Sequence, residues 1–189
     1  GADRNDSGVT IFPNTFESSK DGNGVDPNAS DEGDGITLAE TTNPNSLFYH
    51  CTSQDDTGQY LEERSSWHGT QVSGLIGALT NNGTGMASVG RNVRVLPVRV
   101  LSKCGGWDSD ITAGMLWAAG IAVPGAAANP TPAKVLNLSL GGSGNCSALY
   151  TDIVGQVNAR GAVIVASAGN GTGHAVSEPA NCDGVIGVA

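Results

Sequence analysis

The sequence is poor in aromatic residues, in basic residues and in long apolar runs. Only 5% of its 189 residues are aromatic whereas 28 are glycine, so we expect a core of small aliphatic side chains packed against glycine-rich turns. Nine Lys and Arg residues against 18 Asp and Glu residues give a formal net charge of −9, which argues against nucleic-acid binding. No apolar stretch reaches the ~20 residues of a membrane-spanning helix, and residues 1–15 lack the basic start and apolar centre of a signal peptide. We therefore predict neither a nucleic-acid partner nor a membrane partner.

A CxxC pair is also missing, although the chain contains four cysteines, Cys51, Cys104, Cys146 and Cys182. Cysteines spaced this far apart favour two disulfides over a zinc site. Three pairings can be drawn, and we favour Cys51–Cys104 with Cys146–Cys182. Disulfides indicate an oxidising compartment and hence a secreted, extracellular protein. The alternative is four buried thiols in a cytosolic protein.

The composition and the apolar patterning of the chain change near residue 68. Residues 1–67 are acidic and resemble a loop, whereas residues 68–189 alternate short apolar runs with helical patterns. The apolar runs predict strands over residues 93–101, 133–140, 161–169 and 184–189. The helical patterns predict helices over residues 68–80, 110–123 and 147–161. Alternation of this kind is typical of an α/β protein with a parallel sheet.

Both ends of the sequence differ from those of a complete domain. The run over 184–189 ends without a turn or a cap, and residues 1–8 supply no apolar strand. We expect a fragment, or one chain of a nicked protein.

His68 begins the helix predicted over residues 68–80, whose apolar stripe consists of Val72, Leu75, Ile76 and Leu79. His68 precedes Val72 by four residues, so we expect it in the first turn, on the buried side. The positive end of the helix dipole opposes a cation there. The position therefore favours neutral imidazole, the form that a general base needs.

Two further segments follow predicted strands. In "SAGN", Asn170 comes just after the strand over residues 161–168, where its amide can donate to a developing oxyanion; the alternative is an Asn that closes a turn. In "NLSLGG" (137–142), the strand ends on two glycines and offers an edge to an extended peptide; the alternative is a tight strand-to-helix turn.

Taken together, "HGTQVSG", "NLSLGG" and "VIVASAGN" occur in an order and at distances that resemble the subtilisin-like serine endopeptidases, the subtilase family. "RVLSKCGGW" and "PANCDGVIGVA" are similar to secreted bacterial members. The resemblance implies an α/β, parallel-sheet, subtilisin-like three-layer sandwich, incomplete at the C-terminus, with residues 1–189 forming part of a single catalytic domain. It implies a hydrolase that cleaves polypeptide substrates by a Ser-His-Asp mechanism, with His68 as the general base and Asn170 as an oxyanion-hole donor.

The resemblance also implies that "CGGW" and "SLGG" flank the substrate strand from its two sides. The residues concerned are Gly105, Gly106, Trp107, Ser139, Leu140 and Gly141. We expect Gly105 and Gly106 to leave backbone groups open to a peptide. Trp107 either walls an apolar subsite or packs on the disulfide.

The sequence departs from the family pattern at the nucleophile and at the aspartate. Nothing resembles the "GTSMA"-like serine segment, so no serine here inherits that role and activity requires the remaining C-terminal part of the same protease as a partner. "NDSGVT" resembles the family's aspartate motif and makes Asp6 the candidate. However, either a stretch after Asp6 is deleted or the true aspartate precedes Gly1.

The acidic loop over residues 21–35 offers Asp21, Asp26, Asp31 and Asp34 as hard oxygen ligands, which suit a structural Ca²⁺ ion. It does not fit the EF-hand pattern, and the alternative is a solvated acidic loop. Two other functions stay open. One is a catalytically inactive, subtilase-like peptide-binding module, and the other is an unrelated α/β hydrolase, which would need a "GxSxG" segment that this sequence lacks.

Overall fold

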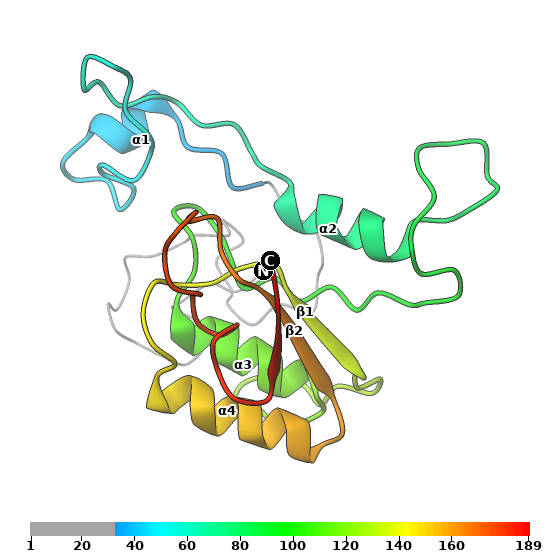
Figure 1. Ribbon diagram of the computed structural model, residues 1–189. Coiled ribbons are helices and arrows are strands. Elements are labelled where there is room, and N and C mark those ends of the chain that lie inside the picture. Colours follow the sequence, from blue (N-terminus) through cyan, green and yellow to red (C-terminus); the bar gives the residue numbers. More distant parts are fainter. Residues whose placement is uncertain (1–32) are drawn as a thin grey trace. The chain divides into compact units, whose positions relative to one another are not determined.

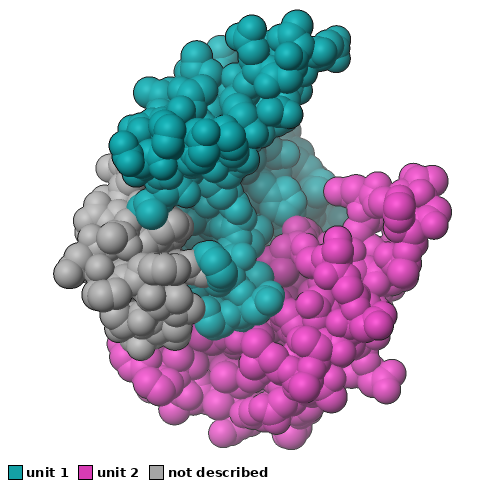
Figure 2. All heavy atoms as spheres, turned by 90° about the vertical axis from the view of Figure 1, so that its left-hand side faces the viewer, with its two compact units in different colours: residues 1–111 teal, residues 112–189 magenta. Residues whose placement is uncertain are grey.

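The computed structural model describes residues 33–189. The chain divides into two compact units, residues 1–111 and residues 112–189, which are coloured teal and magenta in Figure 2. None of the helices within residues 33–189 is both long enough and apolar enough to cross a membrane. That residues 1–189 form part of one catalytic domain stays a prediction.

Residues 112–189 contain a three-stranded parallel sheet in the order β1-β2-β3. The strands are β1 (Val135–Leu138), β2 (Val163–Ser167) and β3 (Val185–Val188). Three of the four predicted strands are thus confirmed, as is their parallel arrangement. The helix α4 (Ala148–Ala159) connects β1 to β2 and runs alongside the sheet (Figure 1).

The sequence of α4 explains both its ends and its packing. Ser147 is the N-cap, and its Oγ accepts a hydrogen bond from the Tyr150 N–H at 3.3 Å. The predicted apolar face is buried in full and consists of Tyr150, Ile153, Val154 and Val157. Gly161, just past the C-cap, has φ +73°, a conformation that glycine adopts without strain. Ile164 of β2 is 0% exposed and belongs to the same core.

The helix α3 (Asp108–Ala118) confirms the helix predicted over residues 110–123, but it ends earlier. Gly120 follows it with φ +78°, which turns the chain out of the helical path. The N–H of Ala133 donates to the Ala118 carbonyl at 2.8 Å and ties the end of the helix to the segment before β1.

Residues 33–111 are organised by short pairings. Ile36 and Glu63 form an antiparallel bridge, and the helix α1 (Leu38–Thr42) follows directly. Thr37 and Glu40 form a capping box at the start of α1, in which each side chain bonds to the other's backbone N–H. The disulfide Cys51–Cys104 joins the segment after α1 to a turn 53 residues further on.

The strand predicted over residues 93–101 was wrong. This segment is neither strand nor helix, and Val93 and Val95 are 49% and 39% exposed. Pro97 lies at its centre and has no N–H to donate to a ladder, so β-branched residues alone do not make it a strand.

The helix α2 (His68–Gly77) confirms the helix predicted over residues 68–80, but its expected burial was wrong. The helix ends three residues earlier than predicted, and none of its residues is buried. Leu75 is 55% exposed, and Leu79, just beyond the helix, is 76% exposed. His68 is itself exposed rather than on a buried side. An apolar period shows which side of a helix prefers to be covered, but it does not supply the surface that covers it.

Candidate active site

His68 is the first residue of α2, and hydrogen bonds of the preceding residues fix the start of that helix. The N-cap is Trp67, which has a left-handed backbone (φ 50°) and makes no side-chain capping bond. The Ser66 Oγ accepts from the His68 N–H at 3.2 Å, and the Gln71 Nε2 donates to the Ser66 carbonyl at 2.9 Å. Ser66 therefore performs the capping that Trp67 does not.

Asp34 holds Ser66 with both of its carboxylate oxygens. Oδ1 accepts from the Ser66 N–H at 2.7 Å, and Oδ2 accepts from the Ser66 hydroxyl at 2.6 Å. Burial raises the pKa of Asp34, but the hydrogen bonds from Ser66 outweigh it and hold the pKa below its ordinary value. Asp34 thus remains an anion that orients the residues leading to His68.

The segment around Gly105 forms a tight turn beside a cavity. The Ser102 N–H donates to the Gly105 carbonyl at 2.8 Å, and the Gly105 N–H donates to the Ser102 carbonyl at 3.2 Å. The expectation that Gly105 leaves its backbone groups open was therefore wrong, because its own turn uses both. Gly106 passes so close to the Val100 carbonyl oxygen that a Cβ would collide with it.

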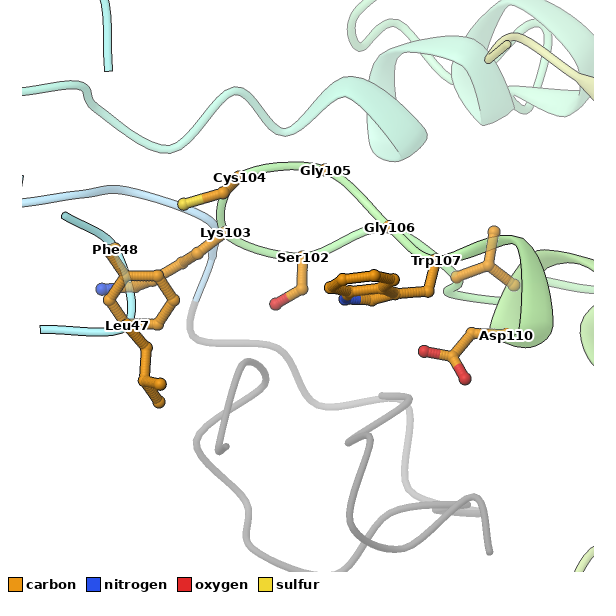
Figure 3. A pocket seen from close by; sticks show the side chains of 10 residues that line it. Leu47, Phe48, Ser102, Lys103, Cys104, Gly105, Gly106, Trp107 and Asp110 are labelled. Carbon is orange, nitrogen blue, oxygen red and sulfur yellow. The ribbon is translucent and has the colours of Figure 1, made fainter. Parts of the chain in front are cut away.

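The cavity has a volume of about 330 Å³, and its lining includes Phe48, Ser102, Cys104 and Trp107. Figure 3 shows the rings of Phe48 and Trp107 at opposite ends of it. Trp107 is 49% exposed, so its indole has room to contact a ligand. Ser102, Lys103 and Asp110 add polar groups to the lining between these two rings.

Lys103 lies in the same lining and is 3% exposed. Its Nζ donates to the Glu40 carboxylate at 2.6 Å and lies 4.9 Å from the centre of the Phe48 ring. Burial raises the pKa of Glu40, but the hydrogen bonds from Lys103 and Thr37 outweigh it and lower the pKa to about 2. Glu40 therefore stays charged and compensates a buried cation next to the Gly105 turn.

Ser139, Leu140 and Gly141 leave the carboxyl end of β1, and Asn170 lies three residues beyond the end of β2. Because the two strands are parallel, both segments emerge at the same edge of the sheet. The Asn137 side-chain amide donates to the Ser139 Oγ at 3.0 Å. The Ser167 hydroxyl donates to the Leu140 carbonyl at 3.5 Å and so links the two segments. The structure thus brings these two predicted segments together, and it leaves Asn170 exposed.

The remaining predicted residues divide into disulfides and acidic residues. Cys51 pairs with Cys104, and Cys146 pairs with Cys182, so the favoured pairing is confirmed. Asp6, Asp21, Asp26 and Asp31 lie outside the described residues. His68 belongs to the unit of residues 1–111 and Asn170 to that of residues 112–189.

Sequence reasoning missed the partners of the predicted residues. Glu40 carried a local signal, since "TLAE" is a capping box, but its pairing with Lys103 spans 63 residues. The contact between Asp34 and Ser66 spans 32 residues, and no local pattern reports it.

Comparison with known proteins identifies the family. The model of the subtilase family matches residues 6–189. The chain belongs to the subtilase family. Its α/β fold is the subtilisin-like one, and it is similar to a solved protease structure from Pseudoalteromonas arctica with a TM-score of 0.74 and 43% identity. That match covers 89% of this chain and 45% of the other.

Curated relatives of this subtilase chain include two extracellular enzymes. An extracellular protease of Xanthomonas campestris pv. campestris is 42% identical over 179 residues, and an extracellular basic protease of Dichelobacter nodosus is 40% identical over 183 residues. Each match covers 94% of this chain but 28% of the relative. The chain thus spans little more than a quarter of the length of these proteins.

Proposed function

We propose that the complete protein is a secreted serine endopeptidase that hydrolyses peptide bonds by a Ser-His-Asp mechanism. The observation that carries this proposal is the family match over residues 6–189, which includes the histidine motif at the start of α2 and the "SAGN" segment after β2. Two relatives are named extracellular proteases, which supports secretion.

In this mechanism, the His68 imidazole removes the proton from the serine hydroxyl as that oxygen attacks the scissile carbonyl, and later gives the proton to the leaving amine. No segment of residues 1–189 resembles "GTSMA". The serine is therefore contributed by another part of the longer protein. Asp6 orients the imidazole. The Asn170 amide donates to the oxyanion, a contact whose loss slows related subtilisins by about 10²–10³ in kcat.

The substrate is an extended polypeptide. It pairs with the edge formed by Ser139, Leu140 and Gly141, which leave the carboxyl end of β1. The acidic loop over residues 21–35 binds a structural Ca²⁺ ion. The donor chemistry supports this, because carboxylate oxygens are the ligands that Ca²⁺ prefers, but Asp34 already bonds Ser66 with both oxygens.

The test uses the complete protein and a fluorophosphonate probe, which reacts with an activated serine. Labelling and peptide turnover are expected, and His68→Ala should lower turnover by several orders of magnitude with folding unchanged. His50→Ala is the matched control, since His50 is an exposed histidine outside α2. Silence of correctly processed wild-type protein towards the probe would favour the alternative, an inactive peptide-binding module. Turnover of His68→Ala within tenfold of wild type would remove His68 from the mechanism.

A further inference from the structure

The edge that the substrate is proposed to use belongs to a longer loop, residues 139–147, which we call the edge loop. A second segment, residues 176–182, packs against it, and we call this the clamp segment. Gly142 and Glu178 form an antiparallel bridge between the two, with the Gly142 N–H donating to the Glu178 carbonyl at 2.9 Å and the reverse bond at 3.0 Å. The approach is close, because a Cβ on Gly141 would lie 2.8 Å from the Glu178 carbonyl oxygen.

The side chain of Glu178 holds the other end of the edge loop. Its Oε2 accepts from the Ser147 N–H at 3.0 Å, and Ser147 is the N-cap of α4. A carboxylate at this place is favoured by the positive end of the helix dipole. The backbone of Glu178 thus fixes Gly142 while its carboxylate fixes Ser147, five residues later.

Two further links join the clamp segment to the edge loop. The Asn181 Nδ2 donates to the Gly144 carbonyl at 2.8 Å and to the Val176 carbonyl at 2.9 Å. The disulfide Cys146–Cys182 crosses between the same two segments. The edge loop is therefore held along its length, by Glu178 at Gly142 and Ser147 and by these two links in between.

We propose that Glu178 is a positioning residue for peptide binding, which keeps the edge formed by Ser139, Leu140 and Gly141 in the conformation that pairs with an extended substrate. This inference rests on the proposed function. An edge that is ordered before binding loses less conformational entropy when the peptide arrives. Removing the carboxylate releases Ser147 and loosens the edge loop, so the cost falls on substrate binding more than on the chemical step.

The test compares Glu178→Ala with Glu178→Gln in the complete protein. The substrates are a tetrapeptide p-nitroanilide, which is long enough to pair with the edge, and an acetylated single-residue p-nitroanilide, which is not. We expect Glu178→Ala to raise KM for the tetrapeptide about tenfold while kcat changes less than threefold. Glu178→Gln keeps an oxygen acceptor for the Ser147 N–H and should restore KM to within threefold of wild type. The short substrate should be affected less than threefold.

Asp183→Ala is the matched control, because Asp183 is an exposed carboxylate just beyond the clamp segment. An equal rise in KM for Asp183→Ala, or for the short substrate with Glu178→Ala, would overturn the proposal. So would an unchanged KM for Glu178→Ala with the tetrapeptide. If Glu178→Ala does not fold, Glu178→Leu replaces it, since leucine keeps much of the side-chain volume but offers no acceptor to the Ser147 N–H and should raise KM in the same way.

Hydrogen exchange separates this inference from the proposed function. In Glu178→Ala, amides of residues 142–147 should exchange at least tenfold faster, while those of residues 153–157 in α4 should not change. Exchange that stays unchanged over residues 142–147 refutes the positioning role, even in an active protease. Faster exchange in a protein without any peptidase activity refutes the proposed function but retains the role of Glu178 in ordering the loop.

Discussion

The ion pair between Glu40 and Lys103 makes a quantitative prediction. Glu40→Gln keeps the size of the side chain and an acceptor for Thr37, but it removes the charge opposite Lys103. The pKa of Glu40 falls from 4.5 to about 2 on folding, which corresponds to about 3 kcal/mol at ~1.4 kcal/mol for each pH unit. Because the side chain of Glu40 is 26% exposed, solvent screens part of this, and we expect a loss of about 2 kcal/mol at pH 7.

The sign of the pH dependence follows from the lowered pKa. The folded state binds the proton on Glu40 more weakly than the unfolded state does, so the stabilisation is fully present above the unfolded pKa of 4.5. It decreases as the pH falls below 4.5 and is lost as the pH passes through about 2. The difference between wild type and Glu40→Gln should therefore shrink over that window.

The assay is urea unfolding of wild type and Glu40→Gln across the range from pH 7 to about pH 2, with Glu62→Gln as the control. Glu62 is an exposed glutamate in the same unit, and its replacement should change the free energy of unfolding by less than about 0.5 kcal/mol. If Glu40→Gln costs the same near pH 2 as at pH 7, the effect does not come from the charge. If Glu62→Gln lowers the free energy of unfolding as much as Glu40→Gln does, the loss does not come from the pair of Glu40 and Lys103.

Three further predictions concern stability. Ile164→Ala should cost about 2–5 kcal/mol in urea unfolding, because Ile164 is 0% exposed and its loss leaves a cavity, whereas a cost below 1 kcal/mol would contradict that packing. Gly161→Ala should cost about 1 kcal/mol, because the φ of Gly161 is +73°. Gly155→Ala should stabilise the protein by up to about 1 kcal/mol, because Gly155 is an exposed residue inside α4 with open space around it. If Gly161→Ala melts at a higher temperature than Gly155→Ala, the helix end assigned at Gly161 is refuted. A chelator should lower the melting temperature if residues 21–35 bind Ca²⁺, and an unchanged melting temperature would count against the site.

The sequence by itself determined the features that depend on neighbours along the chain. The stripe of Tyr150, Ile153, Val154 and Val157 predicted α4 and its buried face, because a period of 3.6 residues is written locally. Short apolar runs predicted β1, β2 and β3 for the same reason. The pairing of the four cysteines was chosen correctly from three alternatives. The family motifs made His68 and Asn170 the candidate catalytic residues, and their roles stay predictions.

Only the tertiary structure decided which distant groups meet. Glu40 bonds to Lys103, 63 residues away, and Glu178 bonds to Ser147, 31 residues away. Such contacts depend on the path of the chain rather than on any local pattern. The same limit explains the errors: residues 93–101 have the composition of a strand and α2 has an apolar stripe. Pairing and burial, however, each require a second surface, and a one-dimensional pattern does not contain that surface.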